Sequence, residues 1–292
     1  MTPLDGRHVA PLESCSGAEA PAAPTERLPS RARHRRRTER LQMLVSPAYA
    51  AGSLLLLLAA WWVASILIGN GQLLATPAQV WHAAIPLIKD GTLAGDIAAS
   101  GKRALAGFAL GTIAAIPVGF ALGWYPLCRR LVEPWLQFMR VIPPIAIIPL
   151  VILWLGIGEE GKIFLIFWAS FLQVVIAVVG GVSAVDAVTI RAARVLGARD
   201  LSIFLDIAVP ASIPYVLVGM RIGLAASWTT LVAAELVAAS SGLGYRIVSA
   251  GNYRQVPVVM LGIITIGILG FLMDRVFLIA EKRLTSWQER AN

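Results

Sequence analysis

Apolar runs about twenty residues long recur along this chain and set the main limit on how it can fold. An α-helix needs about 20 mostly apolar residues to cross the hydrocarbon core of a bilayer. The chain has 292 residues, of which 57% are hydrophobic and only 14% are charged, and its mean hydropathy is +0.73. A soluble domain of this length cannot bury that much apolar surface. We therefore predict an all-α integral membrane protein with about six spans, at residues 48–68, 103–124, 132–155, 163–183, 212–237 and 257–280.

Positive charge is concentrated in alternate loops of this topology. Cytoplasmic loops of membrane proteins carry an excess of Lys and Arg. We therefore expect a multi-pass protein with cytoplasmic N- and C-termini and with the segments 69–102 and 238–256 on the outer side. The basic residues on the cytoplasmic side follow the second, fourth and sixth spans: Arg129, Arg130, Arg191, Arg194, Arg199, Lys282, Arg283 and Arg290.

The first 45 residues are rich in Pro, Ala, Ser, Glu and Arg and show no hydrophobic periodicity. Such a segment buries too little apolar area to offset its chain entropy, so we predict a disordered, basic cytoplasmic tail at 1–45. Its arginines at 31–40 are expected to contact anionic lipid, and with the short basic loops they account for much of the net charge of +8, so we do not expect nucleic-acid binding. The remaining regions are a first transmembrane helix at 46–70, a core at 71–286 that includes a cytoplasmic loop at 187–210, and a cytoplasmic end at 287–292.

The second predicted span carries a stripe of small residues at every fourth position. Small residues at this spacing lie on one face of a helix, where another helix can approach closely. Two interpretations stay open: tight packing within the helix bundle, or the wall of a pathway or a contact between subunits. The stripe consists of Gly107, Gly111, Ala115, Gly119 and Gly123.

The third predicted span opens with a second irregularity. Pro143 and Pro144 lack a backbone N–H and interrupt a regular helix, and Arg140 adds a charge close by. Irregular backbone at membrane depth is tolerated mainly where it is buried in protein or lines a wet cavity, and a charge there is costly. These three residues are therefore candidates for a gate or pathway wall. The alternative is a short loop on the cytoplasmic side whose arginine reaches the membrane interface.

The fifth predicted span contains two charged residues, Arg221 and Glu235. Their separation corresponds to roughly 20 Å along a helix, so they cannot pair with each other. Because a charge facing lipid is costly, each is expected to face protein or water.

The chain carries no signature of catalysis. Gly156 and Lys162 have the spacing of a phosphate-binding loop, but Ile163 occupies the position that must offer a hydroxyl to the metal ion. We therefore expect no enzyme activity, no metal and no bound cofactor in this chain. The histidines and cysteines stand apart and fit no metal-ligand or disulfide spacing: His8, His34, His82, Cys15 and Cys128.

The loop between the fourth and fifth predicted spans resembles the EAA loop of the binding-protein-dependent permeases of ATP-binding cassette importers. The family pattern is Glu-Ala-Ala, three residues, Gly, nine residues, Ile, one residue and Leu-Pro. The chain departs from it at the first position, where Arg191 replaces the acid, and at Val209, where leucine is usual. The matching positions are Ala192, Ala193, Gly197, Ile207 and Pro210.

Further motifs resemble the sulfonate, nitrate and taurine group of these permeases. This resemblance implies import of an aliphatic sulfonate, taurine or nitrate. An aromatic carboxylate, bicarbonate or a pyrimidine or vitamin precursor is the alternative solute. The resemblance to this group also adds Trp228 to the candidate pathway residues, which are then Arg140, Pro143, Pro144, Arg221, Trp228 and Glu235. The motifs are Pro134, 140–146, 149–150, 153–159, Pro214, Gly219, Trp228, Glu235 and 242–244.

The resemblance implies a type I, MetI-like permease in the bacterial inner membrane. Two permease copies, expected to be identical, would enclose the pathway, and a periplasmic or lipid-anchored binding protein would deliver the solute. Two cytoplasmic ATPase subunits would bind ATP and Mg and hold the 187–210 loop as a coupling helix, with Gly197 permitting a turn or close approach. A non-transporting structural or receptor-like membrane protein is the alternative from another class, but it would not need this loop's glycine and proline.

Overall fold

The computed structural model describes residues 49, 52–69 and 73–284. The predicted tail at 1–45 and the predicted end at 287–292 lie outside the described residues. Contacts divide the chain into two units after Leu57, and the arrangement given below concerns the second unit. A helix covers Gly52–Ile68. The elements after it are α2 (Pro77–Lys89), α3 (Thr92–Trp124), α4 (Pro126–Val141), α5 (Pro144–Leu155), α6 (Glu159–Ser183), α7 (Ala187–Val195), α8 (Asp200–Ile203), the π-helical segment η1 (Phe204–Ala208), α9 (Val209–Ala238), α10 (Leu243–Asn252) and α11 (Val256–Leu284).

The described residues of the six predicted spans fall on helices, except at the break at 142–143, and every element in the described part of the chain is helical. Four helices are long and apolar enough to cross a membrane: Thr92–Trp124, Glu159–Ser183, Asp200–Val237 and Val256–Arg283. The pair α4–α5 provides a fifth span if it is counted as one, and the apolar helix Gly52–Ile68 is shorter.

The third predicted span, 132–155, is divided between α4 and α5, which are bent by 100°. The bend follows from Pro143 and Pro144: Ile142 and Pro143 are extended, with ψ of 116° and 133°, before α5 begins. The break expected from the two prolines is therefore confirmed.

The fifth predicted span, 212–237, starts too late. The helix extends back to Asp200 through η1 and continues into α9. Pro210 has no N–H to donate to the preceding turn, and the backbone there takes the wider π-helical form. The proline therefore modifies the helix and does not start it.

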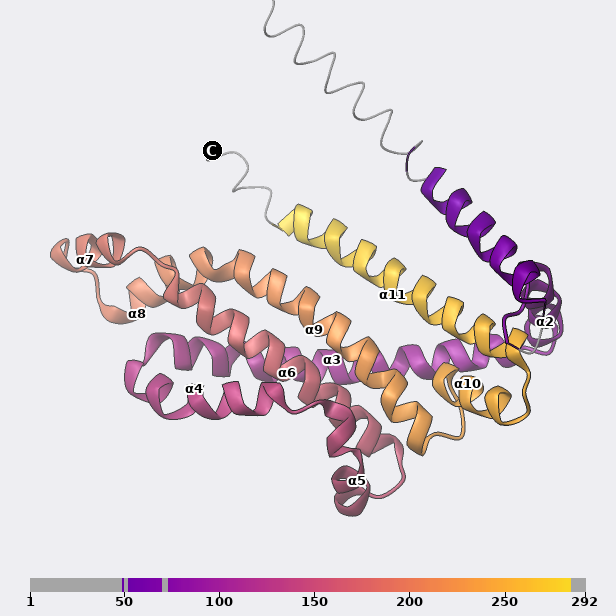
Figure 1. The fold of residues 1–292 in the computed structure, drawn as a ribbon. Helices are drawn as coiled ribbons and strands as arrows, with labels where there is room; N and C mark the ends of the chain where they lie inside the picture. The colour runs from indigo at the N-terminus through magenta and orange to yellow at the C-terminus, as the bar shows by residue number, and fades with distance from the viewer. Residues whose placement is uncertain (1–48, 50–51, 70–72, 285–292) are drawn as a thin grey trace, which may run out of the picture. The chain divides into compact units, whose positions relative to one another are not determined.

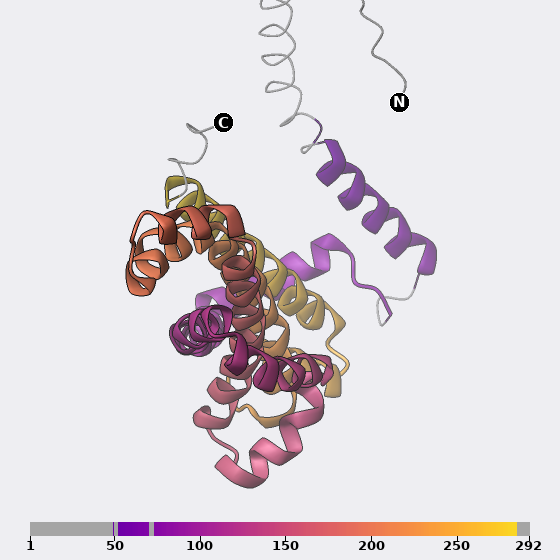
Figure 2. The same ribbon diagram turned by 90° about the vertical axis from the view of Figure 1, so that its left-hand side faces the viewer.

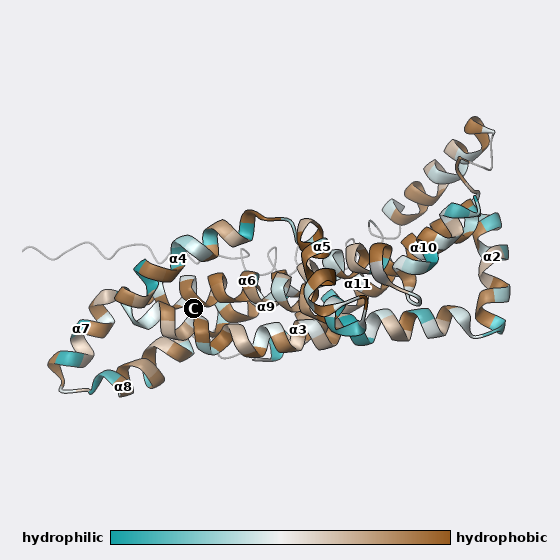
Figure 3. Ribbon diagram, turned by 90° about the horizontal axis from the view of Figure 1, so that it is seen from below, coloured by the Kyte–Doolittle hydropathy of each residue, from teal (hydrophilic) through white to brown (hydrophobic). Residues whose placement is uncertain are grey.

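The long helices α3, α6, α9 and α11 lie side by side (Figure 1). Helices α3 and α6 run parallel, because α4 and α5 return the chain between them, whereas α9 is antiparallel to α6 and α11 is antiparallel to α9. Helices α7 and α8 lie at one end of this bundle and α10 lies at the other; we call these the α7 end and the α10 end. Figure 2 faces the α7 end. Apolar positions dominate the long helices, while polar positions gather on α4, around α7 and α8, and near α10 (Figure 3).

The small-residue stripe of α3 packs against α6 within the chain. A Cβ on Gly107 would come within 2.5 Å of Ile166 Cβ, and one on Gly119 within 2.6 Å of Val178 Cβ. Ala115, between them, is fully buried. Of the two interpretations, tight packing within the bundle is the one observed, because each glycine allows the two backbones to approach closely.

Candidate functional site

The polar loop after α6 folds into the short helix α7, which has a defined start and end. The Asp186 side chain accepts a hydrogen bond from the Val188 N–H at 2.9 Å and so caps the helix. Gly197 follows the last turn with φ of +85°, a left-handed conformation that glycine adopts without strain. The N–H groups of Gly197 and Ala198 close the end with the two hydrogen bonds of a Schellman motif.

Arg191, which stands where the family pattern has an acid, is exposed on α7. Its Nε donates a hydrogen bond to the Ala187 carbonyl of the same helix at 3.2 Å. Ala192 beside it is exposed and Ala193 is half-buried. The arginine is thus accommodated by α7 itself, and its charge is presented at the surface.

The tip of α7 is apolar and uncovered. Val195 is 88% exposed and Leu196 is 87% exposed. Close by, Arg194 pairs with Asp200 at 3.2 Å, but both side chains are more than half exposed. Exposed apolar side chains beside charges are typical of a surface that a partner covers.

The segment after the loop is anchored to the bundle through Phe204. Its ring meets Phe120 edge-on at 5.9 Å and Trp124 at 5.2 Å between ring centroids, both near the end of α3. Ile207 is half-buried in η1, and Pro210 is exposed at the start of α9. The loop therefore has a fixed base and a projecting tip.

The α10 end contains a cluster of charges that are bonded to one another. Glu235 is 1% exposed. It accepts hydrogen bonds from Ser100 Oγ at 2.8 and 2.9 Å, from Arg103 Nη1 at 2.7 Å and from the Gly244 N–H at 2.9 Å. We call the complete set the Arg103 cluster, which consists of Asp96, Ser100, Arg103, Glu159, Lys162, Glu235 and Arg246.

Arg103 connects three parts of the chain at this end. Besides Glu235 on α9, it donates to Glu159 at the start of α6 at 2.5 and 2.7 Å. It also donates to the Ser241 carbonyl at 2.7 Å. Lys162 donates to Glu159 at 2.9 Å, so the two cations and two carboxylates balance in charge. A buried charge needs such pairing to be tolerated.

The Gly-Leu-Gly stretch at 242–244 allows the backbone to approach Glu235 and Arg103. Gly242 has φ of +114°, and a Cβ there would lie 2.7 Å from Arg103 Nη1. A Cβ on Gly244 would lie 2.7 Å from Glu235 Cβ. These two positions require glycine because the loop backbone itself supplies donors to the cluster.

The structure brings two of the predicted pathway residues together, since Arg221 and Trp228 line one cavity between α9 and α11, but it places the others elsewhere. Arg140 is exposed in the last turn of α4, just before Pro143 and Pro144. Arg221 forms a two-point ion pair with Asp274 of α11, at 2.6 and 3.0 Å. Trp228 is buried and lies 3.1 Å from the Met273 sulfur. Glu235 belongs to the Arg103 cluster, so Arg221 and Glu235 have separate partners.

Sequence reasoning missed Asp96, Ser100 and Arg103. The signal was present in their spacing, because residues four and three positions apart share one helix face. All three are buried and polar at the start of α3. The predicted second span began at 103, which left the first two residues in a loop.

Comparison with known proteins identifies the family. Residues 107–286 match the model of the binding-protein-dependent transport system inner membrane component. A probable ABC transporter permease protein of Brucella abortus is 56% identical over 74% of this chain and 86% of its own length. The taurine transport system permease protein TauC of Escherichia coli is 38% identical, over 81% and 88%. The nitrate import permease protein NrtB of Synechocystis is 30% identical, over 88% and 97%.

A solved structure supports the same fold. A chain from the inward-facing MetNI methionine ABC transporter matches with a TM-score of 0.58 and 19% identity, over 69% of this chain and 97% of that chain. The helical architecture is therefore MetI-like, as the loop motif led us to expect. The protein belongs to the inner membrane component family of binding-protein-dependent transport systems, the permeases of ABC importers.

Proposed function

We propose that this chain imports a small solute, an aliphatic sulfonate, taurine or nitrate, into the bacterial cytoplasm. ATP hydrolysis, with Mg, takes place on two separate ATPase subunits and drives the step. Two copies of the chain enclose the pathway, both termini are cytoplasmic, and a binding protein delivers solute at the α10 end. The permease alternates between two arrangements and its partners shift the balance between them.

The α7 loop is the observation that carries this proposal. Its helix is capped at both ends, its base is fixed by Phe204, and the apolar pair Val195 and Leu196 projects from the bundle. A rigid projection with an apolar tip is suited to a cleft on another protein. Val195 and Leu196 would enter the ATPase, while Arg191 would meet its surface.

The pairing of Arg103 with Glu159 and Glu235 supports a different role for the α10 end, which would keep its internal arrangement while α7 moves. Ion pairs tie the starts of α3 and α6 to the end of α9. Movement of α7 would then be transmitted along the long helices to an end that keeps its internal arrangement. The bend at Pro143 and Pro144 lies between α4 and α5, where the backbone is free of the regular helical bonds. This region is the proposed gate.

The solute class is supported by relatives that cover most of the chain. The relatives named for taurine and nitrate are 38% and 30% identical over 81% and 88% of this chain. Both solutes present compact oxyanion groups. Final selection would rest largely with the binding protein.

Co-purification of the ATPase tests the coupling role. The full transporter is expressed with a tag on the permease, and ATPase recovery is compared for Leu196→Asp, Gly197→Trp and wild type. We expect at least a tenfold loss of ATPase recovery and of solute-stimulated ATP hydrolysis for both variants. Both residues are exposed, and a Cβ on Gly197 would meet nothing within 4 Å, so the bundle should fold normally.

The matched control is Tyr253→Asp, which places a charge on a residue 77% exposed after α10. This variant should retain the ATPase at the wild-type level. Wild-type ATPase recovery and transport in the Leu196→Asp and Gly197→Trp variants would refute the assignment of α7 as the coupling helix.

A further inference from the structure

A cavity of about 260 Å³ lies between α9 and α11. Leu224, Trp228 and Phe271 belong to its apolar wall, and the ion pair of Arg221 with Asp274 forms its polar edge. An apolar cavity of roughly 150 Å³ can hold a benzene molecule, so this one has room for a segment of a hydrocarbon chain. We call it the α11 groove.

Two glycines leave the α11 groove open at the surface of the bundle. A Cβ on Gly267 or Gly270 would meet nothing within 4 Å, so neither glycine is needed for close packing against another described helix. Ala225 on the facing helix α9 is exposed, and Gly262 is the one residue of α11 between 256 and 283 that is buried. The groove therefore faces outward, toward the hydrocarbon that surrounds a membrane protein.

The charges of α11 begin at the depth where the hydrocarbon core of a bilayer ends. Residues 256–273 carry no charge, and Asp274 and Arg275 follow directly. At about 1.5 Å per residue the uncharged stretch is roughly 27 Å long, close to the hydrocarbon thickness of roughly 30 Å. Asp274 and Arg275 therefore lie near the lipid headgroups, and Gly267 and Gly270 lie at the depth of the acyl chains.

Arg275 places a positive charge beside the polar edge of the groove. Arg221 and Asp274 satisfy each other at two points, 2.6 and 3.0 Å apart. Arg275 is exposed and forms no ion-pair contact with the residues that the structure describes. Its Cζ atom lies 4.8 Å from the centroid of the Phe271 ring, which lines the groove. An anion can therefore reach Arg275 without displacing a carboxylate.

The order of apolar and basic groups along the groove matches that of a phospholipid. Basic sites between membrane helices on the cytoplasmic side bind anionic lipid headgroups, and the proposed topology places this end of α11 in the cytoplasm. Lys282 and Arg283, both exposed in the last turn of α11, add positive charge beside the single acid Glu281. A compact anionic solute fits less well, because Arg221 is already satisfied by Asp274 and the remaining wall is apolar.

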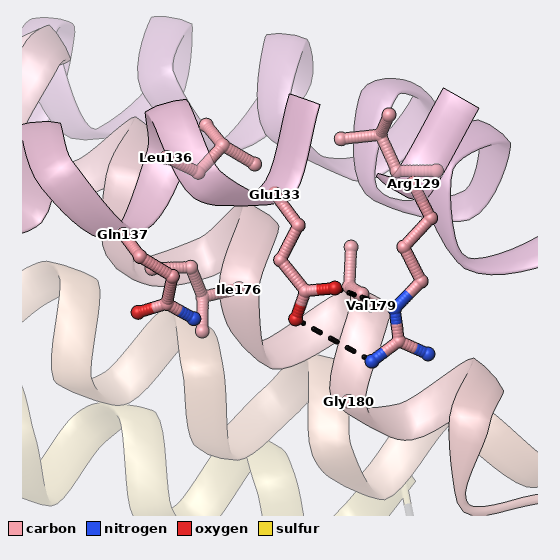
Figure 4. A pocket seen from close by; sticks show the side chains of 8 residues that line it. Arg129, Glu133, Leu136, Gln137, Ile176, Val179 and Gly180 are labelled. Carbon is pink, nitrogen blue, oxygen red and sulfur yellow. Dashed lines mark hydrogen bonds and ion pairs between the residues drawn. The ribbon is translucent and has the colours of Figure 1, made fainter. Parts of the chain in front are cut away.

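A second cavity, of about 150 Å³ between α4 and α6, gives no comparable indication of a ligand (Figure 4). Its ion pair joins Arg129 and Glu133, one turn apart on α4, and the two side chains are 37% and 38% exposed. Pairs of this kind occur on solvated helix surfaces and contribute little. The α11 groove differs because its charges stand at the end of an apolar wall.

We propose that the α11 groove binds an anionic phospholipid of the cytoplasmic leaflet, such as phosphatidylglycerol. One acyl chain lies over Gly267 and Gly270 and against Trp228, and Arg275 holds the phosphate. The lipid fills the space between α9 and α11 and leaves the ion pair between these helices intact. This site goes beyond the proposed import function and does not depend on which solute is carried.

Lipid retention tests the proposal. The full-length chain is purified in a mild detergent, incubated with equal amounts of phosphatidylglycerol and phosphatidylcholine, and measured by native mass spectrometry. Wild type should prefer phosphatidylglycerol by about fivefold, the factor expected for one basic residue at an anionic headgroup. Arg275→Gln should abolish this preference, because it removes the cation that holds the phosphate. Arg130→Gln, exposed on α4, removes the same charge elsewhere and should leave the preference unchanged.

Gly270 provides a steric test that leaves the charges intact. Gly270→Ala adds a Cβ that meets nothing within 4 Å and should retain both lipids as wild type does. Gly270→Leu should fill the groove and abolish retention of both lipids. Added phosphatidylglycerol should raise the melting temperature of wild type and of Gly270→Ala, because a ligand that binds the folded state stabilises it. It should leave the melting temperature of Gly270→Leu unchanged.

The same spectra separate a lipid from a second copy of the chain as the occupant of the groove, because they report the number of copies in each particle. Dissociation of a two-copy particle into single copies in Gly270→Leu would assign the groove to a contact between copies and overturn the proposal. Equal retention of the two lipids by wild type, an unchanged preference in Arg275→Gln, or wild-type retention by Gly270→Leu would also overturn it. None of these results bears on the import function, which the ATPase co-purification tests separately.

Discussion

The α10 end and the α7 end of this permease differ in how far their charged side chains are buried and in where the partners of those side chains lie. At the α10 end, Arg103 and Glu235 are 4% and 1% exposed and take their partners from distant parts of the same chain. At the α7 end, Arg194 and Asp200 are 58% and 73% exposed and belong to a single loop. The polar groups at the α10 end have their partners within the chain, whereas those at the α7 end are exposed at the surface.

This difference indicates where the fold is fixed and where it is available to partners. Interactions between residues distant in sequence at the α10 end hold several helices in one arrangement. Local bonds at the α7 end fix the shape of one short helix, and the edge-on contact of Phe204 with Phe120 and its tilted contact with Trp124 connect the base of that helix to α3. The stability of the bundle should therefore depend strongly on the first end and weakly on the second.

The largest effect is expected from Arg103→Ala. It leaves Glu235 as a buried carboxylate without a cation, and breaking a buried pair in this way costs about 3–5 kcal/mol. The free energy of unfolding should fall by that order, which is measured as a lower melting temperature of the purified protein by tryptophan fluorescence.

The double variant Arg103→Met, Glu235→Gln serves as the control. It removes both charges and leaves Glu159 paired with Lys162. We expect it to recover a large part of the loss, because a neutral replacement carries no uncompensated charge. A melting temperature of Arg103→Ala equal to that of wild type would show that the α10 end is not the stabilised end.

The helices, the break and the loop could be predicted from sequence, but the pairing of distant charged residues could not. Periodicity and apolar length located the helices, Pro143 and Pro144 located the break, and a local motif located the loop with Gly197. Those signals lie within short stretches of chain. The contact between Arg103 and Glu235 joins residues 132 positions apart, and the sequence does not state which distant charges meet. Asp274, the partner of Arg221, was unassigned for the same reason.

The second-largest effect is expected when the same substitution, glycine to alanine, is made at each of the two ends. Gly242 and Gly197 both have positive φ, of +114° and +85°. Gly242→Ala adds backbone strain of about 1–3 kcal/mol and also places a methyl 2.7 Å from Arg103 Nη1. Gly197→Ala meets open space and should cost only the left-handed strain of about 1–2 kcal/mol, confined to α7.

Thermal melting and hydrogen exchange measure these two costs. Gly242→Ala should lower the melting temperature of the whole bundle, whereas Gly197→Ala should increase exchange of α7 amides with a smaller change in melting. Equal effects of the two variants on global melting would contradict the proposed independence of the ends.

The smallest effect concerns the exposed pair at the α7 end. Arg194→Ala should change the free energy of unfolding by only about 0.2–1 kcal/mol, because exposed ion pairs are solvated and screened. Arg246→Ala is the matched variant at the α10 end, where the partner Asp96 is 6% exposed and also accepts a hydrogen bond from the Gly242 N–H.

Melting of both variants is compared at low salt and at about 1 M salt, where the Debye length is about 3 Å. The Arg194→Ala difference should disappear at high salt and the Arg246→Ala difference should persist, since salt screens buried pairs much less. If both differences disappear together, the Asp96–Arg246 pair is as solvated as the loop pair, and the contrast between the ends is restricted to Arg103 and Glu235.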